Sequence, residues 1–159
     1  MRRAIASNGF FGMKAIATAE MARIVSQVTE PVLGITFTEA SGAQASVGAD
    51  WKTAALPIHG GYPITVAVSA DDVCCRTLGA TMFAAPAESV DEAMVADALC
   101  ELVNMTAGLL KSTMRIDQAL GLPSMRQSGI LLEGGGTWSH HFLRAGQLNL
   151  VLAVATRIC

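Results

Sequence analysis

The longest helical pattern in the sequence runs from Val90 to Leu120, and it constrains the fold more than any other stretch. At about 100° of rotation per residue, its polar positions fall within roughly one quarter of the helix circumference. These positions, called the polar stripe below, are Asp97, Glu101, Asn104, Gly108, Lys111 and Arg115. Leucines and valines crowd the opposite side of the helix. The pattern therefore predicts a helix that packs one face into a core and presents the polar stripe to solvent or to a partner.

Gly108 lies in the middle of this helical pattern, on the polar stripe. A glycine inside a helix costs about 1 kcal/mol of stability relative to alanine. Because the residue has no side chain, another backbone could approach the helix closely at this point. We therefore expect Gly108 to belong to a contact surface.

The composition is that of a folded domain. The chain has 159 residues, of which 52% are hydrophobic and 15% are charged. Such a chain is expected to form one compact domain with a sizeable core. Residues 1–15 show no clear period and are predicted to be a loose lead-in, followed by a single domain over residues 16–159. A net charge of −2 offers no basic field for nucleic acid, so no nucleic-acid partner is expected.

Cysteine usage and the N-terminal segment predict a cytoplasmic protein. The four cysteines form no CxxC pair, which indicates neither a zinc site nor a redox motif. Ser7-Asn8-Gly9 interrupts the apolar run that a signal peptide would need. We expect no stretch to approach the roughly 18 apolar residues of a spanning helix, so membrane insertion is not predicted.

The rest of the chain predicts short helices and strands joined by hairpins. Helices are expected over 18–31, over 69–83 from a capping box at Ser69 and Asp72, and from about Val90 to Leu120 after a second capping box at Ser89 and Glu92. Strands are expected over 35–38, 43–47, 51–58, 62–68, 138–143 and 148–158. Hairpins instead of regular β-α-β alternation predict an α+β fold in two layers, with the long central helix packed across one face of an antiparallel sheet.

The polar stripe also carries a motif that resembles a known family. Asp97, Glu101 and Asn104 form Asp-x-x-x-Glu-x-x-Asn, which resembles the signature of the CheC/CheX/FliY phosphatases, enzymes that remove the phosphoryl group from the response regulator CheY. The continuation Met-x-x-Gly108-x-x-Lys111, with Leu122-Pro123 after the helix, is similar to the CheX branch. The resemblance implies a CheX/CheC-like fold.

The number of motif copies also agrees with CheX. CheC and FliY carry two copies of the signature, whereas CheX has a single site. In this chain only Asn104 has a glutamate three residues before it, because Asn8 and Asn149 are preceded at that spacing by Ile5 and Gly146. We therefore expect one active site.

The motif residues suit hydrolysis of an aspartyl phosphate. This reaction needs a water held in line with phosphorus, and the carboxamide of Asn104 can position it without acting as a strong base. Glu101 is anionic and cannot attract phosphate, so its better role is an ion pair with a lysine of the partner. The resemblance implies that Asn104 reaches into the CheY acceptor site beside a Mg²⁺ ion that belongs to the partner. No cofactor is expected in this chain itself.

The resemblance extends to contacts and assembly. Asp97 is expected either to contact the partner or to orient Glu101, and Gly108 and Lys111 are expected in partner binding. CheX-like proteins are dimers in which the sheets of two subunits join, which implies a homodimer. The apolar stretch Leu148–Val154 is a reasonable candidate for the joining edge.

Simpler interpretations stay open. The polar stripe can be an ordinary solvated helix face, with Lys111 and Arg115 paired to Glu101 or Asp117 along the helix. The function can also be that of a non-catalytic module that docks on a receiver domain or on a flagellar or signalling partner. No metal site is predicted, because His140 and His141 are adjacent on a strand and point to opposite faces. The triple glycine 134–136 lacks the lysine of a phosphate-binding loop, and neither Ser112 nor Ser128 has a placed base.

Overall fold

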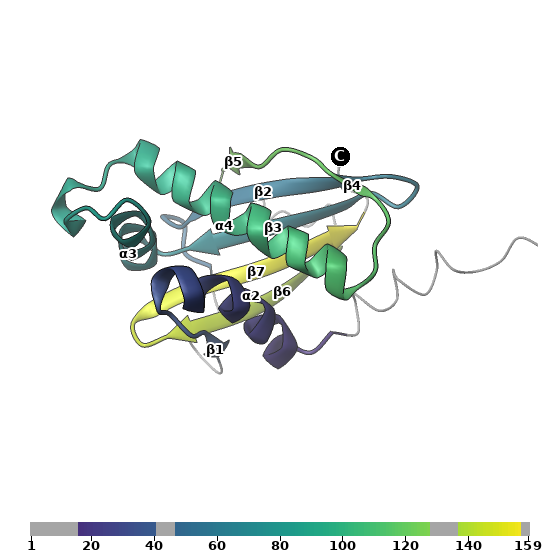
Figure 1. Ribbon diagram of the computed structural model, residues 1–159, viewed down its shortest axis with the longest axis horizontal. Coiled ribbons are helices and arrows are strands. Elements are labelled where there is room, and N and C mark those ends of the chain that lie inside the picture. The colour runs from purple at the N-terminus through teal and green to yellow at the C-terminus, as the bar shows by residue number, and fades with distance from the viewer. Residues whose placement is uncertain (1–15, 41–46, 128–136, 157–159) are drawn as a thin grey trace, which may run out of the picture.

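The computed structural model describes residues 16–40, 47–127 and 137–156 (Figure 1). The elements in chain order are α2 (Thr18–Leu33), β1 (Thr38–Glu39), β2 (Lys52–His59), β3 (Ile64–Ala70), α3 (Asp72–Met82), the 3₁₀ helix η2 (Ala87–Ser89), α4 (Glu92–Thr113), β4 (Ala119–Leu120), β5 (Ser124–Arg126), β6 (Thr137–Ala145) and β7 (Leu148–Thr156). Residues 1–15, most of the strand expected over 43–47, Ser128 and the triple glycine 134–136 lie outside the described residues, so the predictions for them are not tested.

The strands form one sheet in the order β1-β6-β7-β3-β2-β4, and β5 also pairs with β2. Every pairing is antiparallel. The hairpin β2–β3 and the terminal hairpin β6–β7 were both predicted, and Gly146 in the second turn has a φ of +59° that suits glycine. Helices and an all-antiparallel sheet confirm the predicted α+β class.

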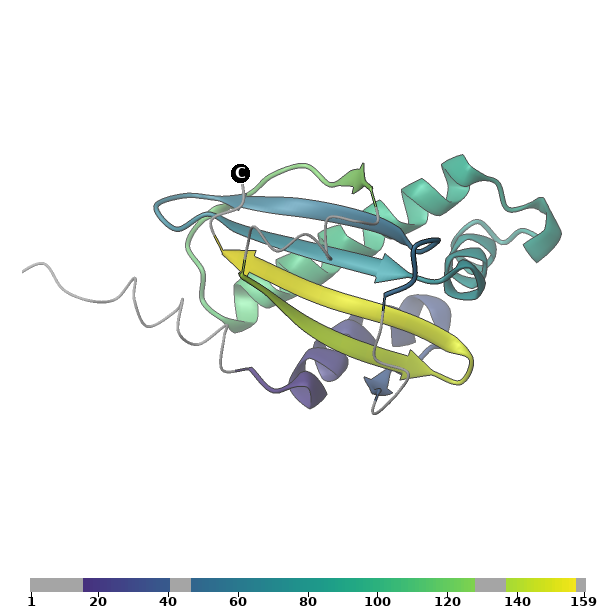
Figure 2. The same ribbon diagram turned by 180° about the vertical axis from the view of Figure 1, so that it is seen from behind.

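The helices lie together on one face of the sheet. Helix α4 crosses the sheet in front of β2 and β3, and α2 and α3 both lie on the same side of α4, toward β7 and β6 (Figure 1). Seen from behind, the sheet faces the viewer and the helices lie beyond it (Figure 2). The fully buried side chains of Leu99, Leu102 and Leu110 on α4 join the main core. This packing fixes which side of α4 faces outward.

The strand expected over 35–38 is wrong in extent, because only Thr38 and Glu39 pair with β6. Residues 35–37 are instead hydrogen-bonded to side chains of α2. The Thr29 hydroxyl donates to the Ile35 carbonyl (2.6 Å), and the Ser26 hydroxyl accepts from the Phe37 N–H (2.9 Å) and lies 3.1 Å from the Phe37 carbonyl. Backbone groups satisfied in this way have no need of a strand partner.

Both predicted capping boxes are wrong. Ser69 lies in β3, where its hydroxyl shares a 2.9 Å hydrogen bond with Thr53, and Asp71 caps α3 by accepting from the Cys74 N–H (2.9 Å). Ser89 lies in η2, and Asp91 caps α4 by accepting from the Met94 N–H (2.8 Å). Each helix therefore begins after an aspartate that follows the serine.

The end predicted for the central helix is also wrong, because α4 stops at Thr113 and not at Leu120. Arg115 adopts a φ of +52°, and the Ile116 N–H donates to the Lys111 carbonyl at 2.9 Å. This pattern is a helix-terminating turn in which a non-glycine residue takes the left-handed conformation. Residues 119–120 then pair with β2 as strand β4. Arg115 accordingly does not belong to the helical part of the polar stripe.

Strand β7 is not an edge strand, which corrects the proposed dimer contact at Leu148–Val154. It pairs with β3 on one side and with β6 on the other. Val151 to Ala155 are buried. A strand that is apolar at consecutive positions is typical of the sheet interior, where both faces are covered.

Helix α4 is long and apolar enough, by length and composition, to count as a candidate membrane span, with a mean hydropathy of 1.4 over its best window. The expectation that no stretch approaches this limit is therefore wrong. In the fold the apolar residues of α4 have a different use, since seven of them are buried within the protein. The hydropathy of this helix is that of a core element.

Candidate active-site surface on helix α4

Five residues of the polar stripe share the outward side of α4. Asp97 and Glu101 are exposed, and Asn104, Gly108 and Lys111 are half-buried. Their spacing of three and four residues places neighbouring members one turn apart on the same face. Because the Leu99, Leu102 and Leu110 side chains are anchored in the core, the helix cannot rotate this face inward.

The polar groups of this surface have no partner within the described part of the chain. Asp97, Glu101, Asn104 and Lys111 make no hydrogen bond or ion pair there. Ion pairs between described residues join Arg23 with Glu20, Lys52 with Glu92 and Arg76 with Asp72. The suggested pairing of Lys111 or Arg115 with Glu101 or Asp117 is therefore not found. A carboxylate and a carboxamide stand one turn apart, uncommitted and accessible.

Gly108 is not required by the packing of the described residues. A Cβ atom built at this position would lie 4.0 Å from Leu120 Cδ1, which is ordinary van der Waals contact. The backbone there has no positive φ that would need glycine. Internal contacts therefore do not explain why this position has a glycine, which destabilises a helix.

A hollow of about 490 Å³ opens beside Glu101. Its lining comes from the end of α2, the end of α3 and the outward face of α4, namely Val32, Met82, Phe83, Asp97, Glu101 and Met105. We call this feature the apolar hollow. Sequence reasoning did not find it, because only the tertiary fold brings the three helices together.

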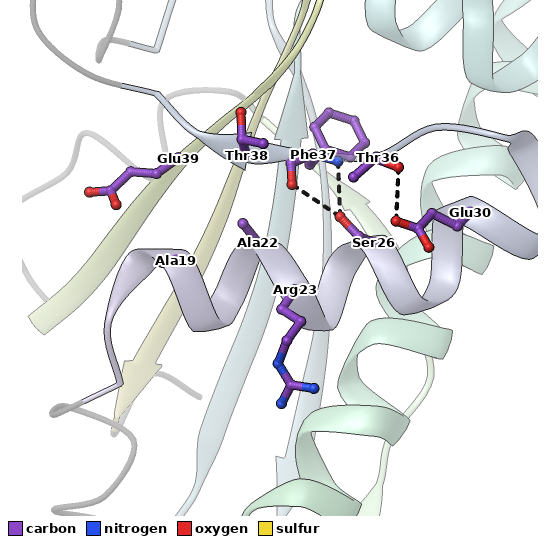
Figure 3. Close-up of a pocket in the computed structure, with 9 residues that line it drawn as sticks. All are labelled: Ala19, Ala22, Arg23, Ser26, Glu30, Thr36, Phe37, Thr38 and Glu39. Carbon is purple, nitrogen blue, oxygen red and sulfur yellow. Dashed lines mark hydrogen bonds between the residues drawn. The ribbon is translucent and has the colours of Figure 1, made fainter.

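A second hollow, of about 300 Å³, lies between α2 and the segment 36–39 (Figure 3). Its polar groups are largely engaged with one another: the Thr36 hydroxyl donates to Glu30 at 2.8 Å, and Ser26 is bonded to the Phe37 backbone. Arg23 is paired with Glu20. This hollow contains no residue of the polar stripe, and its hydrogen bonds are those of a structural joint.

Cysteine chemistry is not supported near the polar stripe. Burial raises the pKa of the Cys75 thiol to about 11 and raises that of Cys74 further. Burial, and then the nearby charge of Asp97, raise the pKa of Cys100. Thiols with raised pKa values are protonated at neutral pH and are poor nucleophiles.

The two adjacent histidines point to opposite faces of the sheet, as predicted. His140 stacks with Phe142, with ring centroids 6.1 Å apart. His141 is buried against α2, where its Nδ1 is hydrogen-bonded to the Thr18 hydroxyl at 3.0 Å. Among the described residues, no group of three potential ligands is placed to hold a metal ion.

Comparison with known structures shows where this fold occurs. The fold is similar to that in the CheX-CheY-BeF3-Mg+2 complex from Borrelia burgdorferi, with a TM-score of 0.68 at 15% identity over 90% of this chain and 99% of that chain. CheX from Vibrio vulnificus gives 0.66 at 13% identity over 90% and 100%. A FliM-SpeE complex from Helicobacter pylori gives 0.64 at 8% identity over 97% and 89%. No curated protein sequence matches the chain.

Comparison with family models addresses the sequence itself. The model described as "Chemotaxis phosphatase CheX" matches residues 52–132, which is just over half of the chain. The matched segment contains the β2–β3 hairpin, α3 and all of α4 with the polar stripe. The resemblance inferred from Asp97, Glu101 and Asn104 is thereby confirmed, and the protein belongs to the CheX family of chemotaxis phosphatases.

Proposed function

We propose that this protein is a phosphatase that hydrolyses the phospho-aspartate of a CheY-like response regulator in chemotaxis or related two-component signalling. One observation carries the proposal: Glu101 and Asn104 lie on the outward side of α4 with no partner among the described residues. Membership of a phosphatase family supports the same reaction. The reaction transfers the phosphoryl group to water and releases inorganic phosphate and a free aspartate carboxylate.

Asn104 is proposed as the catalytic residue. Its carboxamide accepts a hydrogen bond from the attacking water and holds that water in line with phosphorus. The side chain is half-buried, and the core face of α4 fixes the backbone from which it projects. A fixed amide can raise the rate by positioning alone, because the loose transition state of phosphoryl transfer does not demand a strong base.

Glu101 is proposed to dock the partner through an ion pair with a lysine next to the acceptor aspartate. It is exposed, so it can reach a partner without rearrangement of this chain. Asp97, Gly108 and Lys111 are proposed to contact the same partner along α4. The Mg²⁺ ion is proposed to belong to the response regulator, and this chain supplies only Asn104 and Glu101 to the reaction.

The test is a phosphate-release assay with phosphorylated CheY-like receiver domains from the same genome. We expect Asn104→Ala to lower the rate of phosphate release by about 100-fold or more, because a positioned reacting group is lost. Receiver binding should be retained. Glu101→Ala should weaken binding as well as turnover. Glu88→Ala, which removes an exposed carboxylate on η2 outside the polar stripe, is the matched control and should change neither. Acceleration that survives in Asn104→Ala would rule out the proposed mechanism.

The second candidate is a non-catalytic module that docks on a receiver domain or another signalling partner. The similarity to FliM in complex with SpeE favours keeping it, because the same fold occurs there in a complex with a different protein. Binding of the phosphorylated receiver by the wild-type protein without any acceleration of phosphate release would select this alternative.

The predicted homodimer and the predicted cytoplasmic location stay proposals. Joining of two sheets cannot use β7, which has strands on both sides. On that side of the sheet, the described strands that lie outside β7 are β6 and the two-residue β1. A dimer formed by sheet joining is therefore proposed to use this end of the sheet.

A further inference from the structure

We propose that the apolar hollow anchors the receiver domain, by accepting the segment that carries the lysine paired with Glu101 together with an apolar neighbour of that lysine. This inference rests on the proposed phosphatase function and assigns a second contact surface to it. The hollow supplies affinity and choice of receiver, whereas Asn104 supplies the chemistry.

The walls of the hollow come from three helices that pack on one another (Figure 1). Val32 lies in the last turn of α2, and Phe83 caps the end of α3. Asp97, Glu101 and Met105 follow one another at four-residue intervals on α4. A surface assembled from three packed elements is better ordered than one carried by a loop.

Two large apolar side chains at the hollow are exposed to solvent. Val32 is 50% exposed and Phe83 is 46% exposed. The partly buried Met82 and Met105 extend the same apolar lining. Large apolar side chains gathered at one site, next to uncommitted polar groups, are characteristic of interaction surfaces. Methionines add a lining that can adapt to the shape of a partner.

Charge complementarity identifies the occupant. Among the described residues, the charged side chains that line the hollow are the carboxylates of Asp97 and Glu101. A lysine fits this combination, because its aliphatic stem can lie on apolar surface while its ammonium group reaches a carboxylate. The same Glu101 faces the hollow and takes part in the proposed catalytic contact, so the hollow and the active-site surface are continuous.

The experiment separates affinity from turnover. Binding is measured by titration with CheY-like receiver domains from the same genome that have bound beryllofluoride and Mg²⁺. Turnover is measured by phosphate release from the phosphorylated receiver domains. We expect Phe83→Ala to raise Kd and KM about tenfold and Val32→Ala about threefold, both with unchanged kcat, as for partly buried contact residues. Val73→Ala is the matched control, since Val73 is also 50% exposed but does not line the hollow. It should leave both constants within about twofold of wild type.

The outcomes distinguish the hollow from the function on which it depends. If the wild-type protein hydrolyses a receiver phosphate and neither Phe83→Ala nor Val32→Ala alters KM, the anchoring role is wrong and the phosphatase function stands. If no receiver is bound or hydrolysed by the wild-type protein, both proposals fall together. Sedimentation of the same variants tests the other occupant, a second copy of this chain. Loss of self-association in Phe83→Ala without a change in receiver affinity would also overturn the proposal.

Discussion

At the scale of single residues, Gly108 is the position where local energetics and the proposed docking role disagree. A glycine within a helix costs about 1 kcal/mol relative to alanine. The described structure has room for a Cβ atom there, with Leu120 Cδ1 4.0 Å away, so nothing in the internal packing requires the absence of a side chain. A close approach by a partner's backbone would provide the missing reason.

The substitution Gly108→Ala should therefore act in opposite directions on stability and function. We expect the free energy of unfolding, measured with urea, to rise by up to about 1 kcal/mol because of helix propensity. Receiver binding and phosphate release should fall, because a methyl group would separate α4 from the partner. Ser112→Ala, another propensity gain at an exposed position of α4, should stabilise without loss of activity. Full activity in Gly108→Ala would remove Gly108 from the contact surface.

At the scale of elements, the start of α4 shows how a local pattern can be right in kind and wrong in detail. Ser89 and Glu92 have the spacing of a capping box, but Ser89 turns its hydroxyl to the Pro86 carbonyl at 2.8 Å within η2. Asp91 takes the capping position and accepts from the Met94 N–H. Its negative charge also favours the positive end of the helix dipole, which a serine does not offer.

This difference can be measured directly. Asp91→Ala should lower the free energy of unfolding by about 1 kcal/mol, because it leaves an N-terminal amide of α4 without its cap. Ser89→Ala should change it by less than about 0.5 kcal/mol, as is usual for an exposed surface position. Urea denaturation of the two variants is the test. An equal or larger loss in Ser89→Ala would place the cap where the sequence pattern predicted it.

At the scale of the whole molecule, His141 links α2 to the sheet. Burial, and then the charge of His140, lower the pKa of its imidazole below the usual value of 6.5, and Glu39 opposes this only in part. Its Nδ1 is hydrogen-bonded to the Thr18 hydroxyl, while its buried Nε2 has no hydrogen-bond partner within the part of the chain that the structure describes. The folded protein therefore favours the neutral ring, and the unfolded chain binds a proton more readily.

The sign of the pH dependence follows from this depressed pKa. Its contribution to stability is fully present above about pH 6.5 and is lost as the pH falls below that value, because the unfolded state then takes up the proton first. We expect urea denaturation to show a lower free energy of unfolding at pH 5.5 than at pH 7.5. The decrease should be smaller in His141→Gln, which cannot titrate. Equal slopes in the two proteins would show that His141 does not link folding to pH in this range.

Periodicity was enough to predict α4, its buried face and the placing of Glu101 and Asn104 on its outward side. Rotation of about 100° per residue is a local property of the backbone, so residues three and four apart share a face in any α-helix. The two hairpins were readable for a similar reason, since glycine turns between apolar runs act over a few residues.

The tertiary structure alone decided the ends of α4, the interior place of β7 and the meeting of Val32, Phe83 and Glu101 around one hollow. The start of α4 depends on which of several nearby polar side chains accepts from a free amide. Its end depends on a turn in which Arg115, instead of a glycine, adopts the left-handed conformation, so no glycine in the sequence marks it. The position of β7 and the hollow depend on contacts between segments far apart in the chain. Such contacts cannot be predicted from local sequence periodicity, because the pattern of each segment is the same whichever segments it packs against.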